Sequence, residues 1–305
     1  MFDLIANILS IFIRPIYAIV GNYGWTIIIF TILLKLVTMP FTVKSQKSMA
    51  RMQQVQPLIS EIQRKYANNR EKQQQELMKV YDKYEISPTG GCMPLLLQMV
   101  ILMGFIQIVY NPYTFLLNIP ASEISEIASG LGIQLTNQLS LSNEIIAVLA
   151  ERGYETALDL NFLGINLSKV LSENLTDITM WILPVIALVL TILSALMSQN
   201  QATKNQSEKQ KNDPQAQQAA AMSKSMFIMM PLMTAWITYS WPLGCALYWA
   251  ISTITQMAQQ FIVNEFVIKK MKPIVLKKKK KPQVKKEVID VQALSDETDE
   301  GEKND

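Results

Sequence analysis

Apolar blocks long enough to cross a lipid bilayer constrain this chain more than any other feature of its sequence. A hydrocarbon core of about 30 Å requires roughly 20 apolar residues in an α-helix. The 305-residue chain is only 17% charged and contains five such blocks. They cover residues 21–43, 88–110, 178–198, 225–241 and 242–264. The pattern predicts an all-α polytopic membrane protein with five transmembrane helices.

A sixth apolar block, residues 1–20, is interrupted by Arg14 and Pro15. The core of a signal peptide is followed by small residues at a cleavage site, whereas here the next apolar block begins at once. We therefore expect an amphipathic helix in the membrane interface, with a signal-like segment as the alternative.

The distribution of lysine and arginine predicts the orientation. Segment 44–86 carries nine basic residues, segment 199–224 four and segment 265–305 eleven, whereas segment 111–177 carries two against eight acids. Basic segments next to spans stay on the cytoplasmic side. We expect a multi-pass protein of the plasma membrane, with the N-terminus and the 111–177 region outside, and with the 199–224 loop and the C-terminus in the cytoplasm.

Segment 44–87 has the pattern of a helical hairpin. Its apolar residues recur at helical spacing on both sides of Asn68 and Asn69, which can turn the chain. These positions are Met49, Met52, Val55, Ile59, Ile62 and Tyr66, then Leu77, Tyr81 and Tyr84. Pro57 falls inside the first helix, and we expect it to bend that helix.

The tail, residues 265–305, is basic and then acidic, a composition that favours disorder. Its lysine runs can attract anionic lipid or, by counterion release, ribosomal RNA, and composition does not separate the two. The lysines concerned are Lys277, Lys278, Lys279, Lys280, Lys281, Lys285 and Lys286.

Lys35 is the one charged residue inside the first span, nine residues before Lys44. It therefore lies about 13 Å from the cytoplasmic end of the span, farther than its side chain reaches. A lysine at mid-helix costs about 2.5–3.5 kcal/mol on insertion scales. No acidic residue occurs in the five blocks to pair with it. A snorkelling lysine is the simpler alternative, but we expect Lys35 to face water within the protein.

Polar residues at helical spacing on several spans support a hydrated cavity around Lys35. Serine and threonine commonly pack between membrane helices, so each stripe alone is weak evidence. Together with the amide of Gln98 they predict the following lining residues: Thr31, Thr38, Gln98, Thr191, Ser194, Thr234, Thr238, Trp249, Ser252 and Gln256.

Several chemistries are excluded by composition. The chain has no histidine, its two cysteines are Cys92 and Cys245, and no phosphate-binding glycine loop occurs. The segments between the spans hold no convincing nucleophile–base pair. We expect no enzymatic activity, no cofactor and no metal site.

Five stretches together resemble the YidC/Oxa family of membrane protein insertases. They are GNYGWTIIIFTILLKLVTMP, KSMARMQQVQPLISEIQRKY, SPTGGCMPLLLQMVILMGF, WPLGCALYW and QMAQQF, within residues 20–110 and 178–265. The resemblance implies five helices around a hydrophilic groove that is closed to the outside and open to the cytoplasm and to lipid. It also implies that the chain inserts and helps to fold integral membrane proteins, alone or with the Sec translocon. The large outer domain of some bacterial members is absent.

The resemblance also assigns residues. The groove arginine of the family falls on Lys35, its third-span glutamine on Ser194, and its aromatic lining residue on Tyr248 or Trp249. The expected partners are nascent membrane proteins, the Sec translocon, membrane lipid and, through the tail, the ribosome; no small-molecule substrate is expected. Recruitment to the hairpin is assigned to Arg51, Arg64, Lys65 and Arg70.

The alternative function is a small-solute transporter or channel in which Lys35 is the substrate counter-ion. Transporters are often built from inverted repeats, and the five blocks show none. A transporter also has no need of the basic hairpin. The sequence therefore favours the insertase.

Overall fold

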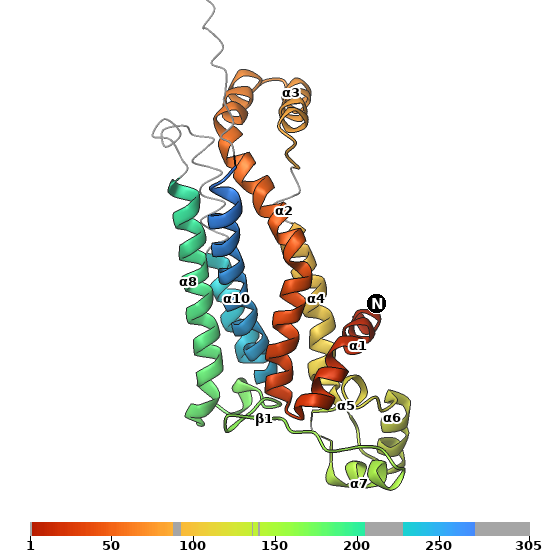
Figure 1. Ribbon diagram of the computed structural model, residues 1–305. Coiled ribbons are helices and arrows are strands. Elements are labelled where there is room, and N and C mark those ends of the chain that lie inside the picture. Colours follow the sequence, from red (N-terminus) through yellow and green to blue (C-terminus); the bar gives the residue numbers. More distant parts are fainter. Residues whose placement is uncertain (1, 88–92, 136, 140, 205–227, 272–305) are drawn as a thin grey trace, which may run out of the picture. The chain divides into compact units, whose positions relative to one another are not determined.

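The structure is a computed structural model that describes residues 2–87, 93–135, 137–139, 141–204 and 228–271. Helices dominate it (Figure 1). The helices are α1 (Phe2–Val20), α2 (Tyr23–Lys65), α3 (Arg70–Lys83), α4 (Met93–Tyr110), α5 (Pro112–Phe115), α6 (Ala121–Gly130), α7 (Asn143–Glu151), α8 (Ile182–Lys204) and α10 (Leu243–Val263), and residues 228–240 are also helical. The shorter elements are strands β1 (Asn161–Phe162) and β2 (Ile165–Asn166), 3-10 turns η1 (Leu171–Glu173) and η2 (Ile178–Trp181), and a π-helical turn η3 (Asn264–Ile268).

The predicted membrane architecture is confirmed in its coarse form, because the described chain is mostly helical and several helices are apolar. Three of these are long and apolar enough to cross a membrane: Phe2–Val20, Tyr23–Lys65 and Ile178–Gln199. Leu96–Tyr110 is a shorter apolar helix. The number of spans, predicted as five, stays a prediction. The antiparallel pair β1–β2 departs from the all-helical expectation, because strands of two residues have no periodicity to detect.

Helix α2 is longer than the span predicted at 21–43. It begins after Asn22, whose side chain accepts a hydrogen bond from the backbone N–H of Trp25 at 3.2 Å. It then runs for 43 residues through Pro40 and Pro57. A proline removes one backbone hydrogen bond from a helix, and the neighbouring turns keep theirs. The membrane segment and the first hairpin helix are therefore one continuous element.

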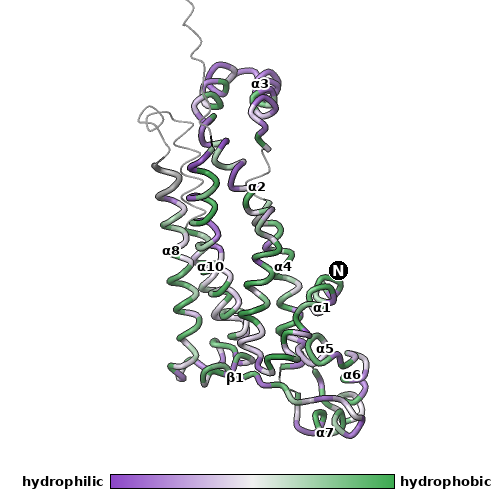
Figure 2. The backbone as a smooth tube through the Cα atoms, in the orientation of Figure 1, coloured by the Kyte–Doolittle hydropathy of each residue, from purple (hydrophilic) through white to green (hydrophobic). Residues whose placement is uncertain are grey.

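Helices α2 and α3 are joined by a tight turn and run antiparallel. Asn69 caps α3 by accepting a hydrogen bond from the N–H of Lys72 at 3.0 Å. Gln73 donates to the carbonyl of Gln63 near the turn, and Arg51 pairs with Glu85 farther from it. The buried apolar side chains here are Val55 and Ile59 on α2, Val80 on α3, and Ile86 just after α3. Figure 2 shows that α3 and the end of α2 beside it are mostly hydrophilic, whereas the earlier part of α2 is mostly hydrophobic.

Helix α10 lies at the centre of the bundle and packs against α8 and α2. Eleven of its 21 residues are buried. It has the length to cross a membrane but is less apolar than the three helices named above. A helix packed against protein needs less apolar surface than one surrounded by lipid, and this accounts for the buried Gln259 of α10.

Helix α1 is continuous, although Arg14 and Pro15 were expected to interrupt it. The guanidinium of Arg14 donates to the carbonyls of Phe115 and Thr114, at 2.9 and 3.2 Å, so its charge is held by backbone dipoles. The helix packs on α4 and α2, and Gly104 allows the close approach, since a Cβ there would lie 2.5 Å from the Cγ2 of Ile5. Its predicted place in the membrane interface stays a prediction.

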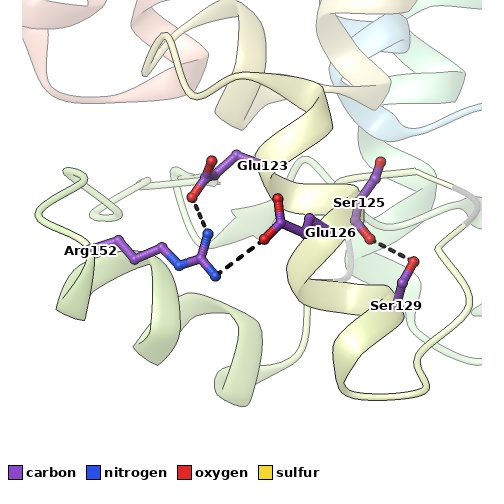
Figure 3. A network of polar contacts seen from close by, with 5 residues as sticks. All are labelled: Glu123, Ser125, Glu126, Ser129 and Arg152. Carbon is purple, nitrogen blue, oxygen red and sulfur yellow. Dashed lines mark hydrogen bonds and ion pairs between the residues drawn. The ribbon is translucent and has the colours of Figure 1, made fainter.

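Segment 111–177 has a small core of its own between α6 and α7. Ile124, Ile127, Ile145 and Leu149 are buried in it. Arg152 at the end of α7 pairs with the carboxylates of Glu123 and Glu126 on α6 (Figure 3). Helix α7 is amphipathic, with Ile145 and Leu149 four residues apart on the face that meets this core.

The second half of this segment is hydrogen-bonded to the beginnings of α2 and α10. The N–H of Tyr23 donates to the carbonyl of Asp159 at 3.0 Å. The N–H groups of Leu243 and Gly244 donate to the carbonyls of Lys169 and Leu167, both at 2.9 Å. These contacts place the chain from 159 to 171 at one end of the bundle.

Gly24 provides a test of this packing. A Cβ at Gly24 would lie 2.6 Å from the Cβ of Phe162, so Gly24→Ala requires a shift of the β1 backbone. We expect Gly24→Ala to lower the free energy of unfolding by about 1–3 kcal/mol, as overpacking does. Gly130→Ala is the control, because a Cβ there meets nothing within 4 Å. Thermal unfolding in detergent checks this; equal stability of the two variants would contradict the close contact.

Candidate functional site

A chain of three polar side chains crosses the bundle from α2 through α4 to α10. The ammonium of Lys35 donates to the Oε1 of Gln98 at 2.9 Å. The Nε2 of Gln98 donates to the hydroxyl oxygen of Tyr248 at 2.8 Å. Tyr248 is also hydrogen-bonded to Ser252 one turn later. Because an amide accepts at oxygen and donates at nitrogen, the two contacts fix the orientation of Gln98.

Lys35 therefore has a protein partner, whereas the sequence predicted that it would face water without one. The prediction placed the amide of Gln98 in the lining around Lys35, but it considered only acidic residues as partners of the charge. An amide oxygen does not neutralise the charge, and an ammonium group has three N–H donors. Among the described residues, Gln98 is the one acceptor seen for these donors. Lys35 is partly exposed.

Gln259 on α10 is hydrogen-bonded to the backbone of Lys35. Its Nε2 donates to the carbonyl oxygen of Lys35 at 2.6 Å, and its side chain is buried. Gln259 was not among the predicted lining residues, although it belongs to the same polar stripe of α10 as Trp249, Ser252 and Gln256. The available signal was its spacing of three residues from Gln256, which continues the polar stripe of α10.

Aromatic rings close one side of the polar chain. Phe30, five residues before Lys35 on α2, stacks on Phe105 at 6.2 Å between ring centroids. Phe105 stacks in turn on Tyr248 at 4.3 Å. All three rings are buried. The sequence did not single out the two phenylalanines, because phenylalanine is ordinary in an apolar block.

The threonines predicted to line the cavity bond to their own helices. In each case the hydroxyl donates to the carbonyl four residues earlier, so it offers a new partner only its lone pairs. These are Thr31, Thr38, Thr191, Thr234 and Thr238, at 2.6, 2.9, 2.8, 3.0 and 2.9 Å. Thr38 is partly exposed and the other four are buried.

The remaining predicted residues fall into two groups. Trp249 is buried and its indole N–H donates to the hydroxyl of Thr191 at 3.2 Å, which joins α10 to α8. Ser194 is partly exposed and Gln256 is exposed. The structure thus brings Lys35, Gln98, Tyr248 and Ser252 into one network, and Thr38 also contacts the carbonyl of Lys35 at 3.3 Å.

The cations of the hairpin differ in their surroundings. Arg51 is engaged with Glu85 at 3.0 Å, whereas Arg64, Lys65 and Arg70 are exposed around the turn. The lysines of the tail, 277–281, 285 and 286, lie outside the described residues, as does Cys92. Cys245 is buried and free. Within the described ranges, no group of three or more metal-ligating side chains comes together.

The chain is similar to known membrane proteins over most of its length. A family model described as 60Kd inner membrane protein matches residues 15–271. Membrane protein insertase YidC of Caldanaerobacter subterraneus is 30% identical over 258 residues, which are 85% of this chain and 93% of that protein. The YidC insertase of Wolinella succinogenes is 25% identical over 250 residues, 82% of this chain and 35% of that protein. That of Nitratidesulfovibrio vulgaris is 38% identical over 132 residues, 42% of this chain and 25% of that protein.

The bridging role of Gln98 can be tested by stability. Gln98→Leu leaves the buried hydroxyl of Tyr248 and the ammonium of Lys35 without this partner. We expect the free energy of unfolding to fall by about 1–3 kcal/mol, the cost of leaving buried polar groups unsatisfied. Gln107→Leu, on the same helix, removes only a 3.5 Å contact with Asn111 and is the control. Chemical unfolding in detergent compares the two, and a smaller loss for Gln98→Leu than for the control would contradict the bridge.

Proposed function

The chain belongs to the YidC/Oxa family of membrane protein insertases, and on this premise we propose that it inserts integral membrane proteins through a groove centred on Lys35. Its clients in this proposal are nascent membrane proteins, which it receives alone or beside the Sec translocon. The family is one of insertases rather than catalytic enzymes, and the proposed mechanism contains no covalent step.

The observation that carries the proposal is a cation within a membrane segment whose charge no described residue neutralises. Lys35 is held by the amide of Gln98 and by the clamp of Gln259 on its carbonyl. A cation fixed in this way attracts an acidic residue in the polar segment of a client. The attraction lowers the cost of bringing that segment into the membrane, because a charge at mid-bilayer is otherwise expensive.

The other groups of the groove complete the proposed path. Thr38, Ser194 and Gln256 reach the surface and replace part of the hydration of the client segment. The apolar helix of the client then leaves sideways into lipid, driven by burial at about 25 cal/mol per Å². The membrane potential favours outward movement of a negative charge by about 2.3 kcal/mol per 100 mV. This supplies work without a bound nucleotide.

The proposal includes an orientation and further partners. The N-terminus and segment 111–177 lie outside, and the hairpin and the tail lie in the cytoplasm, where the basic residues are concentrated. Exposed Arg64, Lys65 and Arg70 at the hairpin turn recruit clients or their carriers. The tail contacts anionic lipid or the ribosome.

Three substitutions separate charge from shape at the groove. We expect Lys35→Arg to retain insertion and Lys35→Ala to impair clients with an acidic translocated segment. We expect Gln98→Glu to behave like Lys35→Ala, because it places a carboxylate against the unchanged lysine. Charges about 4 Å apart attract by about 1–4 kcal/mol at effective dielectric constants of 80 to 20, so acidic clients should lose about fivefold or more in insertion.

Protease protection of matched clients that differ only in tail charge measures this effect. Lys44→Ala is the control, since Lys44 lies on the same helix nine residues farther along. Protein abundance is checked by immunoblot to exclude misfolding. Insertion of acidic clients by Lys35→Ala at the wild-type level would show that the groove does not act through its charge.

The orientation can be tested with single cysteines in a background without Cys92 and Cys245. Ala67 in the hairpin turn and Ala147 on α7 are both exposed, so each should react once it is accessible. In intact cells we expect Ala147→Cys to react with a membrane-impermeant maleimide and Ala67→Cys to be shielded. Both should react after lysis. Labelling of position 67 before lysis would reverse the assignment.

A further inference from the structure

The two-residue turn between β1 and β2 has an unusual occupant. Leu163 has a φ of 49° and Gly164 a φ of 83°, so both lie in the left-handed region. Hairpin turns of this conformation favour asparagine or aspartate followed by glycine, and a branched apolar residue is disfavoured there. Leu163 is also 80% exposed, so it gains nothing from burial in the protein. Neither the turn nor the core explains a leucine at this position.

The neighbouring contacts place this turn at the end of a membrane-crossing helix. Phe162 packs against Gly24, and its ring meets the ring of Trp25 edge-on at 5.5 Å. Trp25 is half-exposed and begins the apolar stretch of α2 that ends near Val43. That stretch is about 28 Å long at 1.5 Å per residue, close to the thickness of a bilayer core. Trp25 is thus at the end of the membrane-crossing stretch, and tryptophan is enriched at the level of the lipid headgroups.

A second apolar group lies at the same end of the bundle, at the start of α8. Ile178 is 82% exposed, and Trp181 and Leu175 are also exposed. The indole N–H of Trp181 donates to the carbonyl of Leu175 at 3.1 Å, which holds this ring in place. These residues continue into the exposed apolar face of α8, the face available to lipid.

We propose that the Leu163–Gly164 turn inserts into the lipid interface and anchors the 159–171 segment to the membrane. The partner is the glycerol and upper acyl region of phospholipids in the leaflet at the Trp25 end. A protein partner is less well matched, because stable interfaces bury about 800 Å² on each side and a two-residue tip offers far less. The turn also adjoins surfaces that already face lipid. The carbonyls of Leu167 and Lys169, in this segment, accept hydrogen bonds from the start of α10. Anchoring the segment therefore fixes how deep the start of α10 lies in the membrane.

Photolabelling tests the proposal on the unaltered chain. The protein is reconstituted in phosphatidylethanolamine and phosphatidylglycerol liposomes with a phospholipid that carries a diazirine near its glycerol. After illumination we expect adducts on the peptide around 161–166, and on α8 as an internal positive control. Asparagine suits the left-handed conformation at position 163 better than leucine does. We expect Leu163→Asn to lose the lipid adduct on residues 161–166 and to keep the adducts on α8. Labelling of α8 without labelling of wild-type 161–166 would overturn the proposal.

A spin label gives an independent measurement that also recognises a protein partner. In the cysteine-free background, Leu163→Cys is compared with Leu131→Cys, since Leu131 is an exposed leucine at the end of α6. We expect the ratio of oxygen to nickel-chelate accessibility to be several-fold higher at 163, because oxygen concentrates in lipid whereas the polar nickel chelate stays in water. Equal ratios at the two positions overturn the proposal. Low accessibility of position 163 to both reagents also overturns it, and indicates a protein contact instead.

Discussion

The charge of Lys35 inside an apolar helix is the constraint around which the middle of the bundle is organised. A lysine at this depth costs about 2.5–3.5 kcal/mol on insertion scales, and the cost must be offset by polar groups from neighbouring helices. Gln98 provides the acceptor, Tyr248 orients Gln98, and Gln259 fixes the Lys35 carbonyl. Three helices are thereby joined at one level by directional contacts, where apolar packing alone would allow sliding.

The parts of this arrangement that follow from local pattern could be predicted from the sequence. Apolar blocks of sufficient length locate the long helices, and the helical spacing of apolar residues locates α7. The depth of Lys35 follows from counting residues along one helix. Its partner does not, because the contact with Gln98 depends on the relative register of α2 and α4. The burial of Thr191 and Thr234 likewise depends on which face of each helix meets its neighbours, and one sequence contains no such information.

The errors have a common physical origin. Arg14 and Pro15 were expected to interrupt the first apolar block, since charge and proline are unfavourable in an apolar helix considered alone. In the structure α1 continues because carbonyls from Thr114 and Phe115 receive the guanidinium of Arg14. Tertiary contacts thus compensate for a residue that is locally unfavourable. The hairpin at 161–166 was missed for the opposite reason, since it depends on contacts with α2 and has little local signal.

The continuity of α2 has a mechanical consequence. Helix α2 runs for thirty residues from Lys35 to Lys65 at the hairpin turn, a length of about 45 Å along its axis at 1.5 Å per residue. Such a helix acts as a lever, so a load on the hairpin turn produces a torque on the polar chain around Lys35. Pro40 and Pro57 each lack a backbone donor, and bending therefore concentrates at these two points rather than along the whole arm. The bending stiffness of the helical stretches between these prolines determines how much of a force applied at the hairpin turn is transmitted to the membrane-crossing part of α2.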